Sequence, residues 1–175
     1  LGAGQMGNGI TQVAACAGYD VLMIDIKQEY VDRGIAAIEK SLAKLVSKDR
    51  MTQEDADASR ARISLSIDRG VCSDCDLVIE AVPEILDLKV SIFQELDVIC
   101  KPETILASNT SSISISTIAE STNRPDKVIG MHFMNPVPIM KLVEIINGKD
   151  TTEETNAAVI EASAKMGKTA LSCND

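Results

Sequence analysis

His132 is the single histidine in the 175 residues of the chain. Imidazole titrates near neutral pH, so if the chain oxidises a hydroxyl to a ketone with a histidine base, that base must be His132. Glu144 follows within a later apolar run, where an acid without a partner is unexpected. A carboxylate bonded to one ring nitrogen would fix the tautomer and stabilise the charged ring. The two residues are a candidate acid–base pair, although a lone histidine beside apolar residues is often only structural.

The chain begins with a glycine-rich motif that predicts a phosphate-binding turn. Leu1-Gly2-Ala3-Gly4-Gln5-Met6-Gly7 is a G-x-G-x-x-G pattern, and a helical stretch follows it as far as Gly18. In a dinucleotide-binding turn Gly2 would permit the tight turn, Gly4 would let the backbone approach a pyrophosphate, and Gly7 would let the helix pack closely on a strand. The pyrophosphate would lie at the helix N-terminus, whose free N–H groups favour anions.

An acid stands where the same fingerprint requires one. The apolar run 21–24 ends at Asp25, about the expected distance after Gly7. Its carboxylate would accept hydrogen bonds from the adenosine ribose and repel a 2′-phosphate, so it favours NAD over NADP as the cofactor. Lys27 is a nearby cation that weakens this preference. The alternative is a glycine-rich turn followed by an aspartate that caps a helix.

A hydroxyl-rich segment, Asn109-Thr-Ser-Ser112, directly follows the apolar run 104–108. His132 lies near the end of another run, 128–133, and the loop Met134-Asn-Pro-Val-Pro138 comes next. Open α/β sheets bind ligands outside the carboxyl ends of their strands, so these segments would face the same ligand. Helix caps are the structural alternative for the two serines.

The elements that would position these residues alternate along the chain. Short apolar runs separate longer stretches with helical spacing, and several runs are apolar at successive positions, as in strands buried on both faces. The run 63–67 alternates instead and suits a strand near the sheet edge. We therefore expect one α/β domain over residues 1–175, with a Rossmann-type, doubly wound, mainly parallel sheet and helices on both faces. The predicted strands are 21–25, 63–67, 76–82, 104–108, 128–133, 142–146 and 169–173.

Local signals mark where helices begin and end. Gly18 is expected as a left-handed C-terminal cap. Thr52 with Asp55 resembles a capping box, and Thr152 is a weaker start for the last helix. Only Leu1 precedes the first glycine, so most of the first strand is expected to be missing from the chain.

Composition argues against several functional classes. The chain has 17 basic and 26 acidic residues and a net charge of −9, which argues against general nucleic-acid binding. No apolar run is long enough to span a bilayer and no signal peptide is apparent, so we expect no membrane partner. The five cysteines are expected to be reduced thiols of a cytoplasmic, bacterial protein, and Cys72-Ser-Asp-Cys75 lacks the second ligand pair of a metal site.

Together, these motifs resemble those of the 3-hydroxyacyl-CoA dehydrogenases. The resemblance covers nearly the whole chain and depends on the glycine motif, on 109–112, and on Met131-His-Phe-Met-Asn-Pro-Val-Pro138 with Met140-Lys-Leu-Val-Glu-Ile145. The segment 25–35 is similar to that of bacterial 3-hydroxybutyryl-CoA dehydrogenases of butyrate metabolism. The resemblance implies an oxidoreductase of butyrate or fatty-acid metabolism. It would transfer a hydride between NAD(H) and C3 of a short 3-hydroxyacyl-CoA or 3-oxoacyl-CoA, such as 3-hydroxybutyryl-CoA or acetoacetyl-CoA.

The resemblance also implies a role for each matching residue. His132 is implied as the general base in oxidation and the acid in reduction, Glu144 as the residue that orients it, and Ser111 as a contact to the substrate oxygen. Cofactor contacts are implied for Gly2, Gly4, Gln5, Met6, Gly7, Asp25, Glu84, Lys89, Ser111 and Asn135.

CoA contacts are implied for Ser41 and Lys48, in addition to Ser111. Lys40, Lys44 and Lys48 recur every four residues, which predicts one basic stripe on a helix, with Ser41 on the same face as Lys48. A solvated lysine face is the alternative.

The family continues into an all-helical C-terminal domain, absent from this chain, that completes the acyl-CoA cleft and forms the dimer. We therefore expect an acyl-CoA substrate, a homodimer through that domain, and neither activity nor high stability in the 175-residue chain alone. Two other classes stay open: a non-catalytic NAD-binding or structural relative, such as the lens crystallins that resemble this family, and another Rossmann dehydrogenase. The combination of Ser111, His132 and Glu144 favours the enzyme over a structural relative, which would have no need of it. The other Rossmann dehydrogenases generally rely on a lysine or a cysteine instead.

Overall fold

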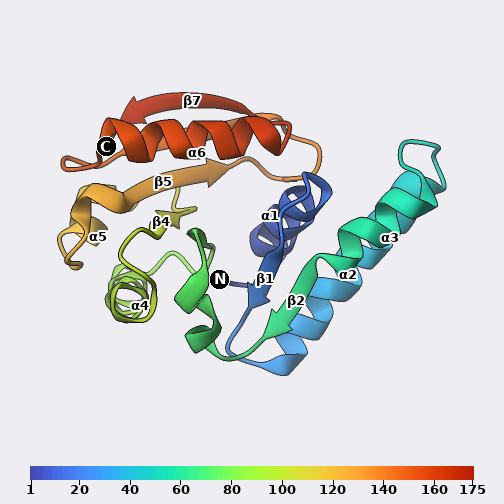
Figure 1. Cartoon of the computed structure of the whole chain (residues 1–175), viewed down its shortest axis with the longest axis horizontal. Helices are drawn as coiled ribbons and strands as arrows, with labels where there is room; N and C mark the ends of the chain where they lie inside the picture. The colour runs from blue at the N-terminus through green and yellow to red at the C-terminus, as the bar shows by residue number, and fades with distance from the viewer.

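The computed structural model describes all of residues 1–175 and confirms the predicted alternation of strands and helices (Figure 1). The strands are β1 (Val21–Ile24), β2 (Ile63–Ser66), β3 (Leu77–Glu80), β4 (Ile105–Ser108), β5 (Val128–Phe133), β6 (Leu142–Asn147) and β7 (Thr169–Asn174). The helices are α1 (Gln5–Cys16), α2 (Gln28–Val46), α3 (Gln53–Ala61), α4 (Leu86–Ile99), α5 (Ile115–Ala119) and α6 (Glu153–Lys165), with short 3-10 helices η1 (Arg69–Asp74) and η2 (Pro125–Lys127). None of the helices combines the length and apolar composition of a membrane span.

The strands form a mainly parallel arrangement, as predicted. β1 pairs with β2, and a five-stranded sheet has the order β3, β4, β5, β6, β7. All neighbours run parallel except β5 and β6, which are antiparallel. β2 pairs only with β1, so the edge position predicted from its alternating pattern is confirmed.

The first two residues connect the two sheets. The Leu1 amine donates to the Ile79 carbonyl, the Ala81 N–H donates to the Leu1 carbonyl, and the Gly2 N–H donates to the Ile24 carbonyl, each at 2.8 Å. Leu1 and Gly2 thus lie between the carboxyl ends of β1 and β3, which therefore share one edge. Leu1 and Gly2, together with residues of β1 and β3, line a groove of about 650 Å³. A strand before Leu1 stays a prediction.

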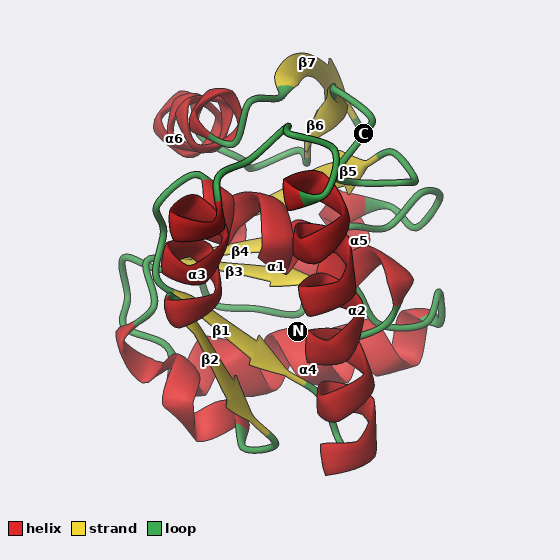
Figure 2. Cartoon of the chain, turned by 90° about the vertical axis from the view of Figure 1, so that its right-hand side faces the viewer, coloured by secondary structure: helices red, strands yellow, loops and turns green.

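Helices cover both faces of the sheet. On one face, α4 and α5 contribute Phe93, Leu96 and Ile118 to a buried cluster with β3, β4 and β5. On the other face, α1 and α6 contribute Ile10 and Val159 to a second cluster. α2 and α3 pack against β1, β2 and α1. In Figure 1 they extend to one side as an arm, and in Figure 2 this arm faces the viewer. The loops that follow the parallel strands are left at one end of the sheet.

The local signals are confirmed with one difference. Gly18 has φ of +89° after α1, and the Thr52 and Thr152 hydroxyls accept hydrogen bonds from the N–H groups three residues later, at 3.0 and 3.3 Å. The Asp55 carboxylate accepts from the Thr52 hydroxyl at 2.7 Å, whereas in a capping box it would accept from the backbone N–H. All five cysteines are free thiols.

Candidate functional site

The glycine motif forms a tight turn before α1. Gly2 has φ of +93°, and a Cβ there would lie 2.6 Å from the Ala81 carbonyl oxygen. A Cβ on Gly7 would lie 1.8 Å from the Gly2 carbonyl oxygen, so both positions require glycine. A Cβ on Gly4 would meet nothing within 4 Å. The space beside Gly4 is open to a ligand, and α1 begins there without a side-chain cap on its free N–H groups.

Asp25 stands beside this turn, at the end of β1. Its carboxylate accepts hydrogen bonds from the N–H groups of Ala3 and Ile26, both at 2.7 Å. A cavity of about 880 Å³ is lined by the glycine turn, Asp25, Tyr30 and Arg33. The free N–H groups, the open space and the acid suit the pyrophosphate and the ribose of a dinucleotide, so the residues present fit the predicted NAD.

His132 and Glu144 face each other across the antiparallel pair β5 and β6. The register places the two residues directly opposite, so their side chains lie on the same face of the sheet. Nδ1 of the imidazole is 2.7 Å from Oε2 of the carboxylate, and the side chains are 24% and 36% exposed. Because Nδ1–H donates to the carboxylate, the lone pair of the neutral ring is on Nε2. The predicted contact between the two side chains is confirmed, and Nε2 makes no hydrogen bond within the chain.

Two hydrogen bonds bring the neighbouring loops together around His132. Gln5 Nε2 on α1 donates to Asn135 Oδ1 at 3.2 Å, which joins the cofactor turn to the loop after β5. The Phe133 N–H donates to Asn109 Oδ1 at 2.9 Å, which joins β5 to the loop after β4. The segments that the sequence placed at one edge of the sheet therefore meet there.

Glu84 connects the loop after β3 with the loop after β4. Its Oε1 accepts hydrogen bonds from the Ser111 N–H at 3.0 Å, the Ser112 N–H at 3.2 Å and the Thr110 hydroxyl. Burial raises the pKa of this carboxyl, but the Thr110 hydroxyl, the Ser111 N–H and Lys89 together outweigh burial and lower the pKa to about 2. Ser111 is exposed, and its hydroxyl makes no hydrogen bond within the chain.

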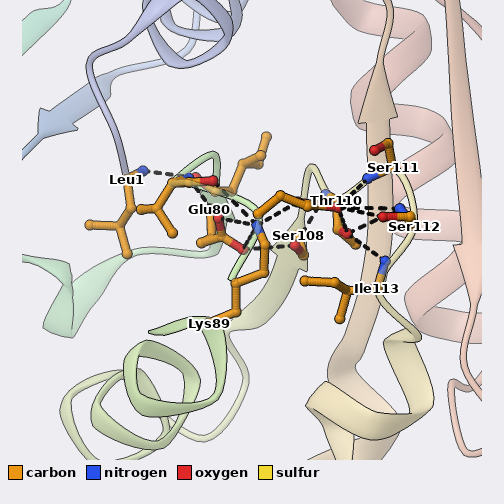
Figure 3. A network of polar contacts seen from close by, with 11 residues as sticks. Leu1, Glu80, Lys89, Ser108, Thr110, Ser111, Ser112 and Ile113 are labelled. Atoms are coloured by element: carbon orange, nitrogen blue, oxygen red, sulfur yellow. Dashed lines mark hydrogen bonds and ion pairs between the residues drawn. The ribbon is translucent and has the colours of Figure 1, made fainter. Parts of the chain in front are cut away.

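Lys89 is buried, although the sequence suggested a direct contact with the cofactor. Its side chain is 1% exposed, and Nζ lies 2.7 Å from Glu80 Oε1 and 3.4 Å from Glu84 Oε2 (Figure 3). Of the two cofactor contacts implied after β3, only Glu84 has an exposed side chain. A contact between Lys89 and the cofactor stays a prediction.

The predicted lysine stripe on α2 is confirmed for Lys40 and Lys44, which are exposed on the helix, but its extension to Lys48 is wrong. The helix ends at Val46, and Lys48 lies in the turn that follows it. The apolar spacing of α2 ends at Val46, because the next four residues are all polar or charged and cannot hold a further helical turn on the core. Asp49 then has φ of +53°, which is not helical. Ser41 and Lys48 therefore do not share a helical face. Lys48 is exposed in the turn that connects α2 to α3, and this connection lies at the tip of the arm that the two helices form (Figure 1).

Sequence reasoning missed three charged residues around the site. Glu80 is buried beside Lys89, Arg33 lines the cofactor cavity, and Lys168 donates to the carbonyl oxygens of Val137 and Met140 in the loop after His132. Only Glu80 had a usable signal, because it is an acid inside an apolar run, the same pattern that identified Glu144.

Residues 1–175 match the family model described as the NAD-binding domain of 3-hydroxyacyl-CoA dehydrogenase. A probable 3-hydroxybutyryl-CoA dehydrogenase of Deinococcus radiodurans is 53% identical over 100% of this chain and 63% of that protein. The 3-hydroxybutyryl-CoA dehydrogenase of Bradyrhizobium diazoefficiens is 48% identical over 96% of this chain and 57% of that protein. The crystal structure of (S)-3-hydroxybutyryl-CoA dehydrogenase from Ralstonia eutropha has a TM-score of 0.98 and 45% identity over 99% of this chain and 62% of that chain.

The chain spans about three fifths of the length of the curated relatives it matches, 63% of one and 57% of the other. The part that matches contains the glycine turn, the hydroxyl-rich loop and the pair of His132 and Glu144, all within the family model. The chain therefore belongs to the 3-hydroxyacyl-CoA dehydrogenase family and corresponds to its NAD-binding domain.

Proposed function

We propose that the native protein transfers a hydride between NAD(H) and C3 of a short-chain 3-hydroxyacyl-CoA or 3-oxoacyl-CoA. The observation that carries the proposal is the 2.7 Å contact between His132 Nδ1 and Glu144 Oε2 beside the cofactor turn. Interconversion of an alcohol and a ketone needs a group that exchanges the hydroxyl proton, and an imidazole oriented through Nδ1 does this with Nε2. The names of the relatives, 3-hydroxybutyryl-CoA dehydrogenases, support the acyl-CoA substrate.

The mechanism assigns one task to each member of the pair. Bound NAD(H) supplies the hydride acceptor in oxidation and the donor in reduction. In oxidation, His132 Nε2 takes the proton of the C3 hydroxyl as the hydride leaves C3, and in reduction the imidazolium returns that proton to the forming alkoxide. Glu144 holds the ring through Nδ1–H and stabilises the positive charge that the ring carries between these steps.

Ser111 and Asn135 complete the site in this proposal. The backbone of Ser111 is fixed through Glu84, which leaves its hydroxyl to donate to the substrate oxygen where negative charge develops. Asn135 accepts a hydrogen bond from Gln5, which lines the cofactor cavity, and is proposed to contact the nicotinamide end of the cofactor. Glu84, with its exposed carboxylate, is a further candidate for contact with the cofactor.

The remaining partners are part of the same proposal. Ser41 and Lys48 are proposed to contact the CoA, without sharing one helix face. The native protein is proposed to be a cytoplasmic homodimer that associates through the helical domain typical of the family. Membership of the family and the bacterial origin of several relatives support these assignments.

The proposal is tested with the native protein expressed with its natural ends. NADH oxidation should be rapid with acetoacetyl-CoA and fall sharply in His132→Gln, while NADH binding measured by fluorescence titration stays nearly unchanged. NADH binding without turnover of any short 3-oxoacyl-CoA would favour the non-catalytic, crystallin-like alternative. Equal turnover of the free 3-oxoacid would favour a Rossmann dehydrogenase of another kind.

A further inference from the structure

A buried ionic network lies behind the candidate site, and Glu80 is at its centre. The Glu80 side chain is 0% exposed at the end of β3. Its Oε1 accepts from Lys89 Nζ at 2.7 Å and from the Val82 N–H at 2.6 Å, and its Oε2 accepts from Lys89 Nζ at 3.0 Å and from the Ser108 hydroxyl at 2.7 Å. Figure 3 shows Lys89 reaching from α4 to Glu80, whose carboxylate also meets Ser108. One carboxylate thus joins β3, α4 and β4.

We propose that Glu80 is a positioning residue, which fixes the loop that presents Ser111 to the substrate. The first connection from Glu80 to this loop is electrostatic. Lys89, held by Glu80, also pairs with Glu84 at 3.4 Å, and Glu84 accepts the Ser111 N–H at 3.0 Å. The inference rests on the proposed function, because that function gives Ser111 its role.

A second route runs from Glu80 to the same loop through β4. The Ser108 hydroxyl donates to Glu80 Oε2, and its oxygen accepts the Thr110 N–H at 3.2 Å. The Thr110 hydroxyl oxygen in turn accepts the N–H groups of Ser112 at 3.3 Å and Ile113 at 2.9 Å. The loop is therefore attached to Glu80 on both sides of Ser111.

The charges of the network explain why the carboxylate matters beyond its hydrogen bonds. Lys89 is a buried cation between two carboxylates and lies closer to Glu80, at 2.7 Å, than to Glu84, at 3.4 Å. A buried cation needs an anion beside it. Without the charge of Glu80, Lys89 would depend on Glu84 alone and draw that carboxylate away from the N–H groups of Ser111 and Ser112. The loop would then lose its anchor although no residue of the loop had changed.

Helix α4 also offers a matched control. Asp97 Oδ1 is 2.7 Å from Arg124 Nε, with side chains 6% and 10% exposed. Asp97 Oδ2 also accepts hydrogen bonds from the backbone N–H and the side-chain amide of Asn123. Neither residue of this second buried ion pair contacts Glu84 or the 109–112 loop. Asp97→Asn therefore reproduces the loss of a buried charge on the same helix without touching the proposed routes.

The experiment compares Glu80→Gln with Asp97→Asn in the native protein expressed with its natural ends. Amide hydrogen exchange of residues 109–113 should rise by about tenfold in Glu80→Gln, since hydrogen bonds to a charged acceptor stabilise by about that factor. Turnover of acetoacetyl-CoA should fall by a similar factor at temperatures where each variant is fully folded. In Asp97→Asn, both the exchange of this loop and the turnover should stay within about twofold of wild type.

Three outcomes would overturn the inference. They are unchanged exchange at 109–113 in Glu80→Gln, faster exchange spread evenly over the chain, and an equal loss of turnover in Asp97→Asn. If Glu80→Gln does not fold, Ser108→Ala replaces it, because this variant keeps the ion pair of Glu80 and Lys89 but removes the hydrogen bonds of the second route. Unchanged amide exchange at Thr110 and Ser112 in Ser108→Ala would then overturn the inference. A wild-type protein without activity would refute the proposed function, whereas the exchange data would still decide whether Glu80 holds the loop.

Discussion

Replacing His132 and Glu144 singly and together tests whether the two residues act as one unit. General acid–base catalysis contributes roughly 10²–10⁴-fold, which corresponds to about 3 to 5 kcal/mol of transition-state stabilisation. His132 is the only imidazole of this domain, so no other ring of the domain can substitute for it. His132→Gln should therefore lower kcat by a factor in that range and leave the Kd for NADH nearly unchanged.

Glu144→Gln should have a smaller effect, because the amide oxygen can still accept from Nδ1–H and keep the ring in place. The substitution removes the negative charge of the acceptor, whose oxygen lies 2.7 Å from Nδ1. Hydrogen bonds to charged groups are stronger than neutral ones by about 1 to 1.5 kcal/mol, so kcat should fall by about five- to tenfold. The side chains are 24% and 36% exposed, and solvent screening favours the lower end of this range.

The double variant separates a coupled pair from two independent residues. If Glu144 acts only through the imidazole, the double variant should be little worse than His132→Gln alone, because members of one catalytic unit are not additive. The assay is steady-state NADH oxidation with acetoacetyl-CoA, with Glu103→Gln as control, an exposed carboxylate before β4 at the opposite end of the sheet. Full multiplication of the two losses would show that Glu144 acts independently of His132, and the pairing would be wrong.

Three further substitutions test the surroundings of the pair. Asp25→Ser should raise kcat/KM for NADPH relative to NADH, because repulsion of the 2′-phosphate is removed while Arg33 still lines the cavity. An unchanged ratio of these two kcat/KM values would refute this role of Asp25. Lys168→Met should lower the free energy of unfolding by about 1 to 3 kcal/mol in a denaturant titration and also reduce kcat, because two carbonyls of the 134–141 loop lose their donor. Glu84 has a pKa lowered from 4.5 to about 2, so it contributes stability that is present above pH 4.5 and lost as the pH falls to about 2. Acid titrations of unfolding should therefore show a shallower loss over this interval in Glu84→Gln, and identical curves would contradict it.

The strands and the cofactor turn could be predicted because their signals are local. Runs such as Leu77-Val78-Ile79 are apolar at successive positions, which a strand buried on both faces requires. Gly2 and Gly7 could be assigned from spacing alone, and the structure shows the close backbone contacts that forbid a side chain at both. In these elements, the residues that form the sequence pattern are also the residues that make the buried contacts, so the sequence alone was sufficient.

Features that depend on where an element ends or what packs behind it could not be predicted in the same way. Lysine spacing continues past the end of α2, but the apolar side chains that hold the helix on the core do not, so the stripe stops before Lys48. Glu80 stands at a strand end, where an acid is also compatible with a ligand contact. Its burial is decided by Lys89, which reaches it from α4. Spacing along the sequence carries no information about that packing.

The direction of β6 could have been deduced, and it is what assembles the candidate acid–base pair. Parallel neighbours need a crossover of about a dozen residues or more, whereas the segment 134–141 between β5 and β6 is shorter and allows only an antiparallel return. In the antiparallel register the end of β5 meets the start of β6, so His132 lies opposite Glu144. A slip of one residue would turn Glu144 to the other face of the sheet and leave the imidazole without its carboxylate. The short connection that follows His132 is therefore as necessary to the pair as the two side chains themselves.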